Sequence, residues 1–172
     1  MNKKKNSFEE AIKSATLWCN TWQREELSDE VLADRVSELL KTKDGARAFF
    51  AISLSSDSPL MDRIPDVLLI KLIEAGDQVV DLTVKNLAMS SAMSLTHQRA
   101  KNVDLQSGSE KVKERCIELL KRLDPKKVKK RLELLLDGIK GEGPDNLFLN
   151  HWLYDDEQRN IIAKNINLVA EN

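Results

Sequence analysis

The two histidines of this 172-residue chain, His97 and His151, are the first candidates for catalytic or metal-binding side chains. His151 precedes a carboxylate-rich stretch, and Asp155, one helical turn later, is the partner with which it could share a metal ion. Asp155 also has the position of a helix N-cap, and neither a His-x-x-x-His nor a Glu-x-x-His pattern is present. The sequence therefore predicts no metal site and no cofactor.

The two cysteines, Cys19 and Cys116, are too far apart in sequence to form a local ligand pair. Each falls within an apolar pattern of helical period, which is typical of a buried, reduced thiol. This use of cysteine favours the reducing cytoplasm.

A run of small residues and methionines from Met89 to Ser94 offers hydroxyl groups but no visible base to activate them. No nucleophile elbow, phosphate-binding loop or dinucleotide fingerprint occurs in the chain. Small side chains usually let helices pack closely. The alternative is a pocket beside Ser91, Met93 and His97, with methionine as an adaptable lining. The missing catalytic motifs favour a non-enzymatic role, and an enzyme or ligand carrier stays the alternative.

A basic stretch is the sharpest feature of the sequence. Between residues 110 and 133, ten basic residues stand against five acidic ones, a net charge of +5. A surface of this charge could hold phosphates. No aromatic side chains are interleaved to stack on bases, and a helical wheel spreads the lysines over the whole polar arc. The candidate interaction surface consists of Lys121, Arg122, Lys126, Lys127, Lys129, Lys130 and Arg131.

Two acidic segments flank the basic one along the chain. Residues 25–38 and residues 137–158 each carry a net charge of −5, so the total of −1 hides a strong segregation of charge. These segments could neutralise the basic one within the fold or across a homo-oligomer.

The elements that must position these residues are helices. Six glycines and four prolines are few for a chain of this length, which disfavours a sandwich of many short strands. Helix starts are indicated at Ser7 with Glu10, at Ser28, at Asp44, at Pro65, at Asp124 with Pro125, and at Asp155 with Gln158. A central helix is expected from Asp77 to about Lys101, with Gly76 either ending or kinking the helix before it. Residues 102–109 are expected to form a polar link.

These patterns predict an all-α, single-domain bundle of about eight or nine helices without a sheet. The domain is expected to span residues 7–172, after a basic tail at residues 1–6. The longest uncharged run, from Asn86 to Gln98, is too short and too polar to cross a membrane, so no membrane partner is expected.

Two stretches of the sequence support a resemblance to a known family. They are DGARAFFAISLSSDSPL, from Asp44 to Leu60, and VVDLTVKNLAMSSAMSLTHQR, from Val79 to Arg99. The chain resembles a family of conserved hypothetical proteins of cyanobacteria over most of its length. This resemblance implies a cytosolic bacterial protein and, since the family has no assigned activity, supplies no catalytic residues.

Three classes of function remain, in this order. The first is a non-enzymatic helical adaptor that binds a protein partner or associates with itself. The second is a nucleic-acid-associated regulator that uses the basic helices of residues 110–133. The third is an enzyme or small-ligand carrier with a pocket beside the Ser/Met-rich central helix.

Overall fold

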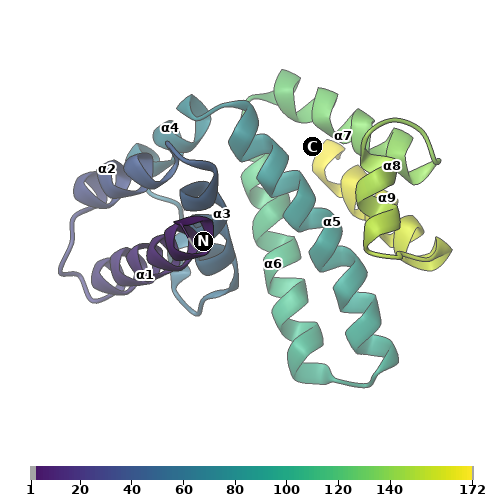
Figure 1. Cartoon of the computed structure of the whole chain (residues 1–172), viewed down its shortest axis with the longest axis horizontal. Coiled ribbons are helices and arrows are strands. Elements are labelled where there is room, and N and C mark those ends of the chain that lie inside the picture. The colour runs from purple at the N-terminus through teal and green to yellow at the C-terminus, as the bar shows by residue number, and fades with distance from the viewer. Residues whose placement is uncertain (1–2, 172) are drawn as a thin grey trace. The chain divides into compact units, whose positions relative to one another are not determined.

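A computed structural model describes residues 3–171, with side chains from Ser7 onward. Over this range the chain forms nine α-helices and one short 3-10 helix, with no strand (Figure 1), which confirms the predicted all-α fold. The basic tail predicted for residues 1–6 lies outside the residues whose side chains are described. The helices are α1 (Lys3–Gln23), α2 (Asp29–Leu39), α3 (Lys43–Ser55), η1 (Pro59–Met61), α4 (Asp66–Glu74), α5 (Asp77–Arg99), α6 (Val103–Arg122), α7 (Pro125–Ile139), α8 (Asp145–His151) and α9 (Asp156–Ala170).

Several helices begin where the sequence indicates. The Ser28 hydroxyl accepts a hydrogen bond from the Val31 amide, 3.2 Å away, and so caps α2. Asp155 and Gln158 form a complete capping box at the start of α9. The first helix differs, because α1 begins at Lys3 and Ser7 therefore lies inside it; lysine is a good helix former and extends the helix past the predicted start. In α3 the cap is Thr42, not Asp44.

Gly76 ends a helix instead of kinking it. The helix α4 stops at Glu74, and Gly76 has a φ of 66°, in the left-handed region that glycine adopts without strain. Its amide donates to the Ile73 carbonyl oxygen at 3.0 Å. The central helix α5 then starts at Asp77, as predicted.

The polar link predicted for residues 102–109 is wrong, because these residues form the start of α6. The Asn102 side chain accepts from the Leu105 amide at 3.1 Å, and Asp104 stands in the first turn, where the helix dipole favours an acid. Val103 is 74% exposed and Leu105 is 53% exposed. With no buried face in these turns, no apolar period marks them as helical.

The chain divides into two compact units, Met1–Leu82 and Thr83–Asn172, and the boundary falls within α5. In unit 1, α1 packs against α3 and α2 packs against α4. In unit 2, α6 packs against α7 and α9, and α7 packs against α8 and α9. The cores of both units are built from side chains that are buried on these faces, among them Cys19, Leu32, Phe49, Phe50, Leu68 and Leu72 in unit 1, and Cys116, Leu119, Leu135, Leu149, Ile162 and Ile166 in unit 2.

Candidate functional site

The basic residues lie around a tight corner between α6 and α7. Leu123 is the C-cap of α6, and the Asp124 carboxylate accepts from the backbone amides of Lys126 and Lys127 at 2.9 and 3.4 Å. Pro125 occupies the first position of α7, where its missing N–H costs nothing. This cap places both lysines in the first helical turn, in spite of the unfavourable dipole.

The seven predicted cations do not all lie on one open surface. Arg122, Lys126, Lys127, Lys129 and Lys130 are exposed, and the Lys121 side chain is 26% exposed. Lys121 pairs with Glu118 at 3.6 Å, and Lys129 pairs with Glu133 at 4.0 Å. Surface pairs of this kind contribute little stability. A partner's carboxylates can therefore replace the acids that pair with Lys121 and Lys129. For the six residues other than Arg131, the interaction surface stays a prediction.

Arg131 has a different position from the other six. Its side chain is only 13% exposed and forms two parallel hydrogen bonds to the Asp145 carboxylate, which is 8% exposed; the contact from Nη2 to Oδ1 is 2.9 Å. This bidentate ion pair joins α7 to the first residue of α8. Arg131 therefore helps to fix α8, and it joins the basic segment to the second acidic one.

A groove of about 370 Å³ opens between the end of α6, the length of α7 and the end of α9. Its lining is mainly apolar and includes Leu120, Leu123, Pro125, Val128, Leu132, Leu136, Ile166, Val169 and Ala170. Lys121, Lys129, Glu133 and Asn167 complete the lining. Lys126, three residues before Lys129, lies on the same side of α7. The groove thus combines an apolar floor with a mainly basic rim.

Three large apolar side chains at the α8–α9 end of unit 2 lie in solvent, and we call Leu147, Trp152 and Leu153 the apolar corner. They are 74%, 48% and 86% exposed, respectively. Leu153 has a φ of 56°, a conformation that is uncommon for a residue with a branched side chain. The Trp152 ring meets the His151 ring edge to face at 5.2 Å. Exposed apolar side chains that include a tryptophan are typical of a contact surface.

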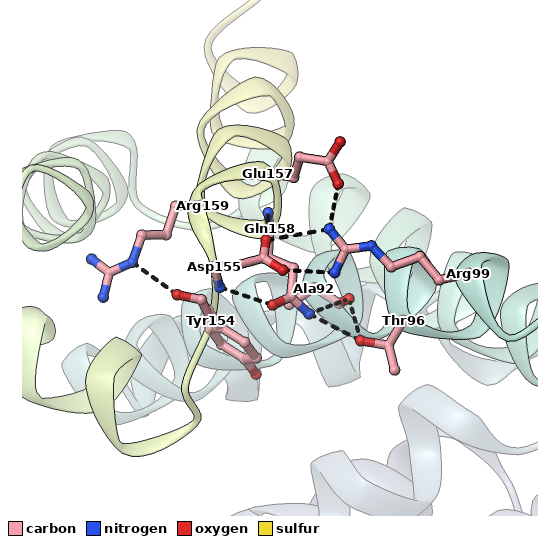
Figure 2. Close-up of polar contacts among 8 residues, drawn as sticks. All are labelled: Ala92, Thr96, Arg99, Tyr154, Asp155, Glu157, Gln158 and Arg159. Carbon is pink, nitrogen blue, oxygen red and sulfur yellow. Dashed lines mark hydrogen bonds and ion pairs between the residues drawn. The ribbon is translucent and has the colours of Figure 1, made fainter.

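A polar junction between α5 and α9 holds the chain just after this corner (Figure 2). The Arg99 guanidinium donates to Asp155 at 2.7 Å and also to Glu157. The Gln158 amide nitrogen donates to the Thr96 hydroxyl at 2.9 Å and to the Ala92 carbonyl at 3.2 Å. The hydrogen bonds from the Arg99 side chain and from the Gln158 backbone N–H hold the pKa of Asp155 below its usual value.

Arg159 clamps the other side of the corner. Its Nε donates to the Tyr154 carbonyl at 3.2 Å, as Figure 2 shows, and one Nη donates to Asn150 at 2.7 Å. The other Nη reaches the carbonyl oxygens of Gly138 and Ile139 at 3.3 and 3.4 Å, near the end of α7. The hydrogen bonds of Arg99 and Arg159 therefore hold in place the backbone that carries the apolar corner.

The predicted pocket residues on α5 have different surroundings. Ser91 is fully buried; its hydroxyl donates to the Leu87 carbonyl at 2.6 Å and accepts from Asn165 of α9 at 2.8 Å. Met93 is 37% exposed, and positions two apart on a helix point about 200° from each other. His97 is half-buried one turn after Met93. Ser91 thus serves helix packing, and a pocket shared with Met93 and His97 stays a prediction.

The cysteines are buried free thiols, as predicted. Burial raises the pKa of Cys19 to about 11 and that of Cys116 further still, so neither is a ready nucleophile. Among the residues that the structure describes, no three His, Cys, Asp or Glu side chains gather where a metal ion could bind. His151 instead contacts Trp152, while Asp155 caps α9.

Sequence reasoning missed the positioning residues Arg99 and Arg159, because an arginine that reaches across a fold leaves no local pattern. Gln158 and Asn165 did leave a signal. They fall on the buried face of α9 that Ile162, Ile166 and Val169 define. A polar side chain at such a position needs a buried partner, and both have one on α5.

Comparison with known proteins gives one result. A family model described as "Uncharacterised conserved protein UCP020893" matches residues 7–169. No curated protein and no solved structure shows a significant match. The predicted resemblance to an uncharacterised family is confirmed, and the cyanobacterial origin stays a prediction.

Proposed function

The chain belongs to this family of uncharacterised conserved proteins, and we propose that it acts as a non-enzymatic adaptor that binds a protein segment in the groove of α6, α7 and α9. The single observation that carries the proposal is the apolar groove with its basic rim. A cytoplasmic location is part of the proposal, supported by the two buried, unpaired cysteines.

The chemistry of the groove indicates what kind of segment it takes. Its volume of about 370 Å³ lies at the small end of the range for ligand pockets, so it accommodates a few apolar side chains of a partner. The rim cations Lys121 and Lys129 favour carboxylates beside these side chains. An amphipathic, acidic segment satisfies both requirements.

The test uses three labelled synthetic peptides with the same apolar anchors, flanked by Asp and Glu, by Ser and Gln, or by Lys. Fluorescence anisotropy with the intact protein is expected to rank their affinities in that order. The variant Asn167→Trp fills the groove from an exposed position of α9 and should abolish binding. Asn160→Trp, an exposed position two turns earlier, is the matched control. Equal affinities for all three peptides, or full binding by Asn167→Trp, would refute the proposal.

A nucleic-acid-associated role is the second candidate, favoured by the exposed cations on both sides of the α6–α7 corner. It predicts DNA or RNA binding whose affinity falls steeply with salt. The variant Lys126→Glu/Lys130→Glu should abolish such binding, whereas Asn167→Trp should leave it intact. Nucleic acid that shows no binding at about 50 mM salt would dismiss this candidate.

No helix among the described residues has the length and apolar character that crossing a bilayer requires.

The third class of function, an enzyme or small-ligand carrier, would hold its ligand in a cavity. Native mass spectrometry of the purified protein would detect such a ligand.

A further inference from the structure

We infer that the segment bound in the groove is the apolar corner of a second copy of this chain, so that copies associate head to tail. This inference rests on the proposed function and names its partner. Two separate features of unit 2 carry it: an apolar recess on α6, α7 and α9, and an apolar projection between α8 and α9.

The projection has the composition that the recess requires. Leu153 is 86% exposed and Trp152 is 48% exposed, which leaves two large side chains with little cover in the single chain. Tryptophan is enriched among the residues that dominate binding energy at protein interfaces. A groove of about 370 Å³ with leucine, valine and isoleucine walls can bury such side chains.

The charges beside the two features are opposite. Asp155, Asp156 and Glu157 begin two residues after Leu153, and these three carboxylates outnumber the Arg99 guanidinium that pairs with two of them. The groove has Lys121 and Lys129 on its rim, with Lys126 beside them, against the single acid Glu133 among the residues that line it. An acidic projection and a basic recess attract one another.

A chain cannot bring its own corner into its own groove. The corner joins the start of α9, whereas the α9 residues that line the groove begin at Ile166, about 15 Å further along the helix. Arg99 and Arg159 fix the chain at that start. The corner is therefore directed to another molecule.

This geometry makes a heterologous contact, in which the two surfaces that meet are different. One copy then keeps a free corner and the other a free groove, so association continues into rings or chains. A symmetric dimer would stop at two copies, so the size of the assembly distinguishes the two arrangements.

The test is analytical ultracentrifugation of the full chain and two variants over a range of concentrations. Leu153→Gly removes an anchor and relieves the positive φ, so the fold should not suffer. Asn167→Trp fills the groove. Each variant alone should self-associate with an affinity at least about thirtyfold weaker than that of the wild type. Leu105→Gln, which removes an exposed leucine outside the corner, should behave as the wild type.

Mixing the two variants gives the decisive result. Leu153→Gly keeps an open groove and Asn167→Trp keeps an intact corner, so the mixture should form a one-to-one dimer and nothing larger. High salt should weaken this dimer. A mixture that remains monomeric, or variants that dimerise as well as the wild type, would overturn the inference.

The failure of this inference differs from the failure of the proposed function. A wild type that is monomeric at every concentration, yet binds the acidic peptide in the groove, overturns the second copy as partner and leaves the adaptor proposal in place. A protein that neither self-associates nor binds the peptide overturns both.

Discussion

Arg131 and Asp145 show how a single residue of the basic stretch can serve the fold instead of a partner. Both side chains are largely buried, so removing the arginine leaves a carboxylate without its counter-charge. We expect Arg131→Met to lower the free energy of unfolding by about 3–5 kcal/mol, measured by urea denaturation. Adding Asp145→Asn should recover much of that loss. Lys130→Met, at an exposed neighbouring position, should change stability by less than about 0.5 kcal/mol.

Asp155 links stability to pH at the α5–α9 junction. Because the hydrogen bonds from Arg99 hold the pKa of Asp155 below its usual value of about 3.9, the carboxylate contributes stability that is complete above that pH. The contribution is lost as the pH falls through the lower pKa of the folded state. The stability difference between the wild type and Asp155→Asn, in which asparagine can still cap α9, should therefore shrink below about pH 4. Denaturation curves between pH 7 and about pH 2 measure it. Asp156→Asn is the matched control, and a difference that stays constant to the lowest pH would contradict the prediction.

At the scale of the helices, two glycines with opposite surroundings test how closely α7 approaches α8. A Cβ atom on Gly138 would lie 2.7 Å from the Asp145 Cβ and 2.9 Å from the Asp145 carbonyl carbon. A Cβ on Gly108, in α6, would meet nothing within 4 Å. We expect Gly138→Ala to destabilise the protein by about 1–3 kcal/mol, because backbone must move. Gly108→Ala should stabilise it by up to about 1 kcal/mol. Chemical denaturation compares them, and equal effects would refute the close approach.

The sequence predicts helices well where a local signal specifies them. Ser28, Asp124 with Pro125, and Asp155 with Gln158 all cap helices as expected, since the N-cap hydrogen bond is made within three residues. The start of α6 escaped prediction because its first turns are exposed on every side and so carry no apolar period. Its N-cap, Asn102, was the signal that could have revealed it.

The candidate groove could not be predicted, for a different physical reason. Val128 and Leu132 belong to a periodic apolar pattern. Such a pattern predicts that other helices pack against this face of α7, but it does not predict how much of the face they bury. Whether α9 closes over that face depends on the packing of α6, α7 and α9 together. The basic residues were found from the sequence, whereas the apolar groove and the ion pair of Arg131 with Asp145 needed the fold.

For the whole molecule, the net charge of −1 conceals a division of charge among separate segments. The first acidic segment, residues 25–38, belongs to unit 1, and the basic and second acidic segments belong to unit 2. Within unit 2, the pair of Arg131 with Asp145 joins the latter two. The lysines of the groove rim pair with acids of their own helices, through exposed contacts that a partner's carboxylates can replace.

The continuity of α5 through both units leads to a prediction about cooperativity, and we propose that the chain unfolds as the single domain that its sequence suggests. Val79 and Val80 on one side of the boundary, and Val84 and Leu87 on the other, are buried along one uninterrupted helix. Helix formation is cooperative, so loss of unit 1 should fray α5 into unit 2. Phe49→Leu, in the core of unit 1, should therefore lower one melting midpoint for the whole chain, by roughly 2–4 °C per kcal/mol lost.

Tryptophan fluorescence can follow each unit separately, because Trp18 and Trp22 lie in unit 1 and Trp152 lies in unit 2. In a Trp152→Phe background the signal reports unit 1, and in a Trp18→Phe/Trp22→Phe background it reports unit 2. We expect Phe49→Leu to shift both signals equally, and Gly138→Ala, in unit 2, to do the same, because coincident transitions are the mark of two-state unfolding. If the Trp152 transition stays in place while that of Trp18 and Trp22 moves, the units unfold independently and α5 is a linker between two domains instead of the centre of one.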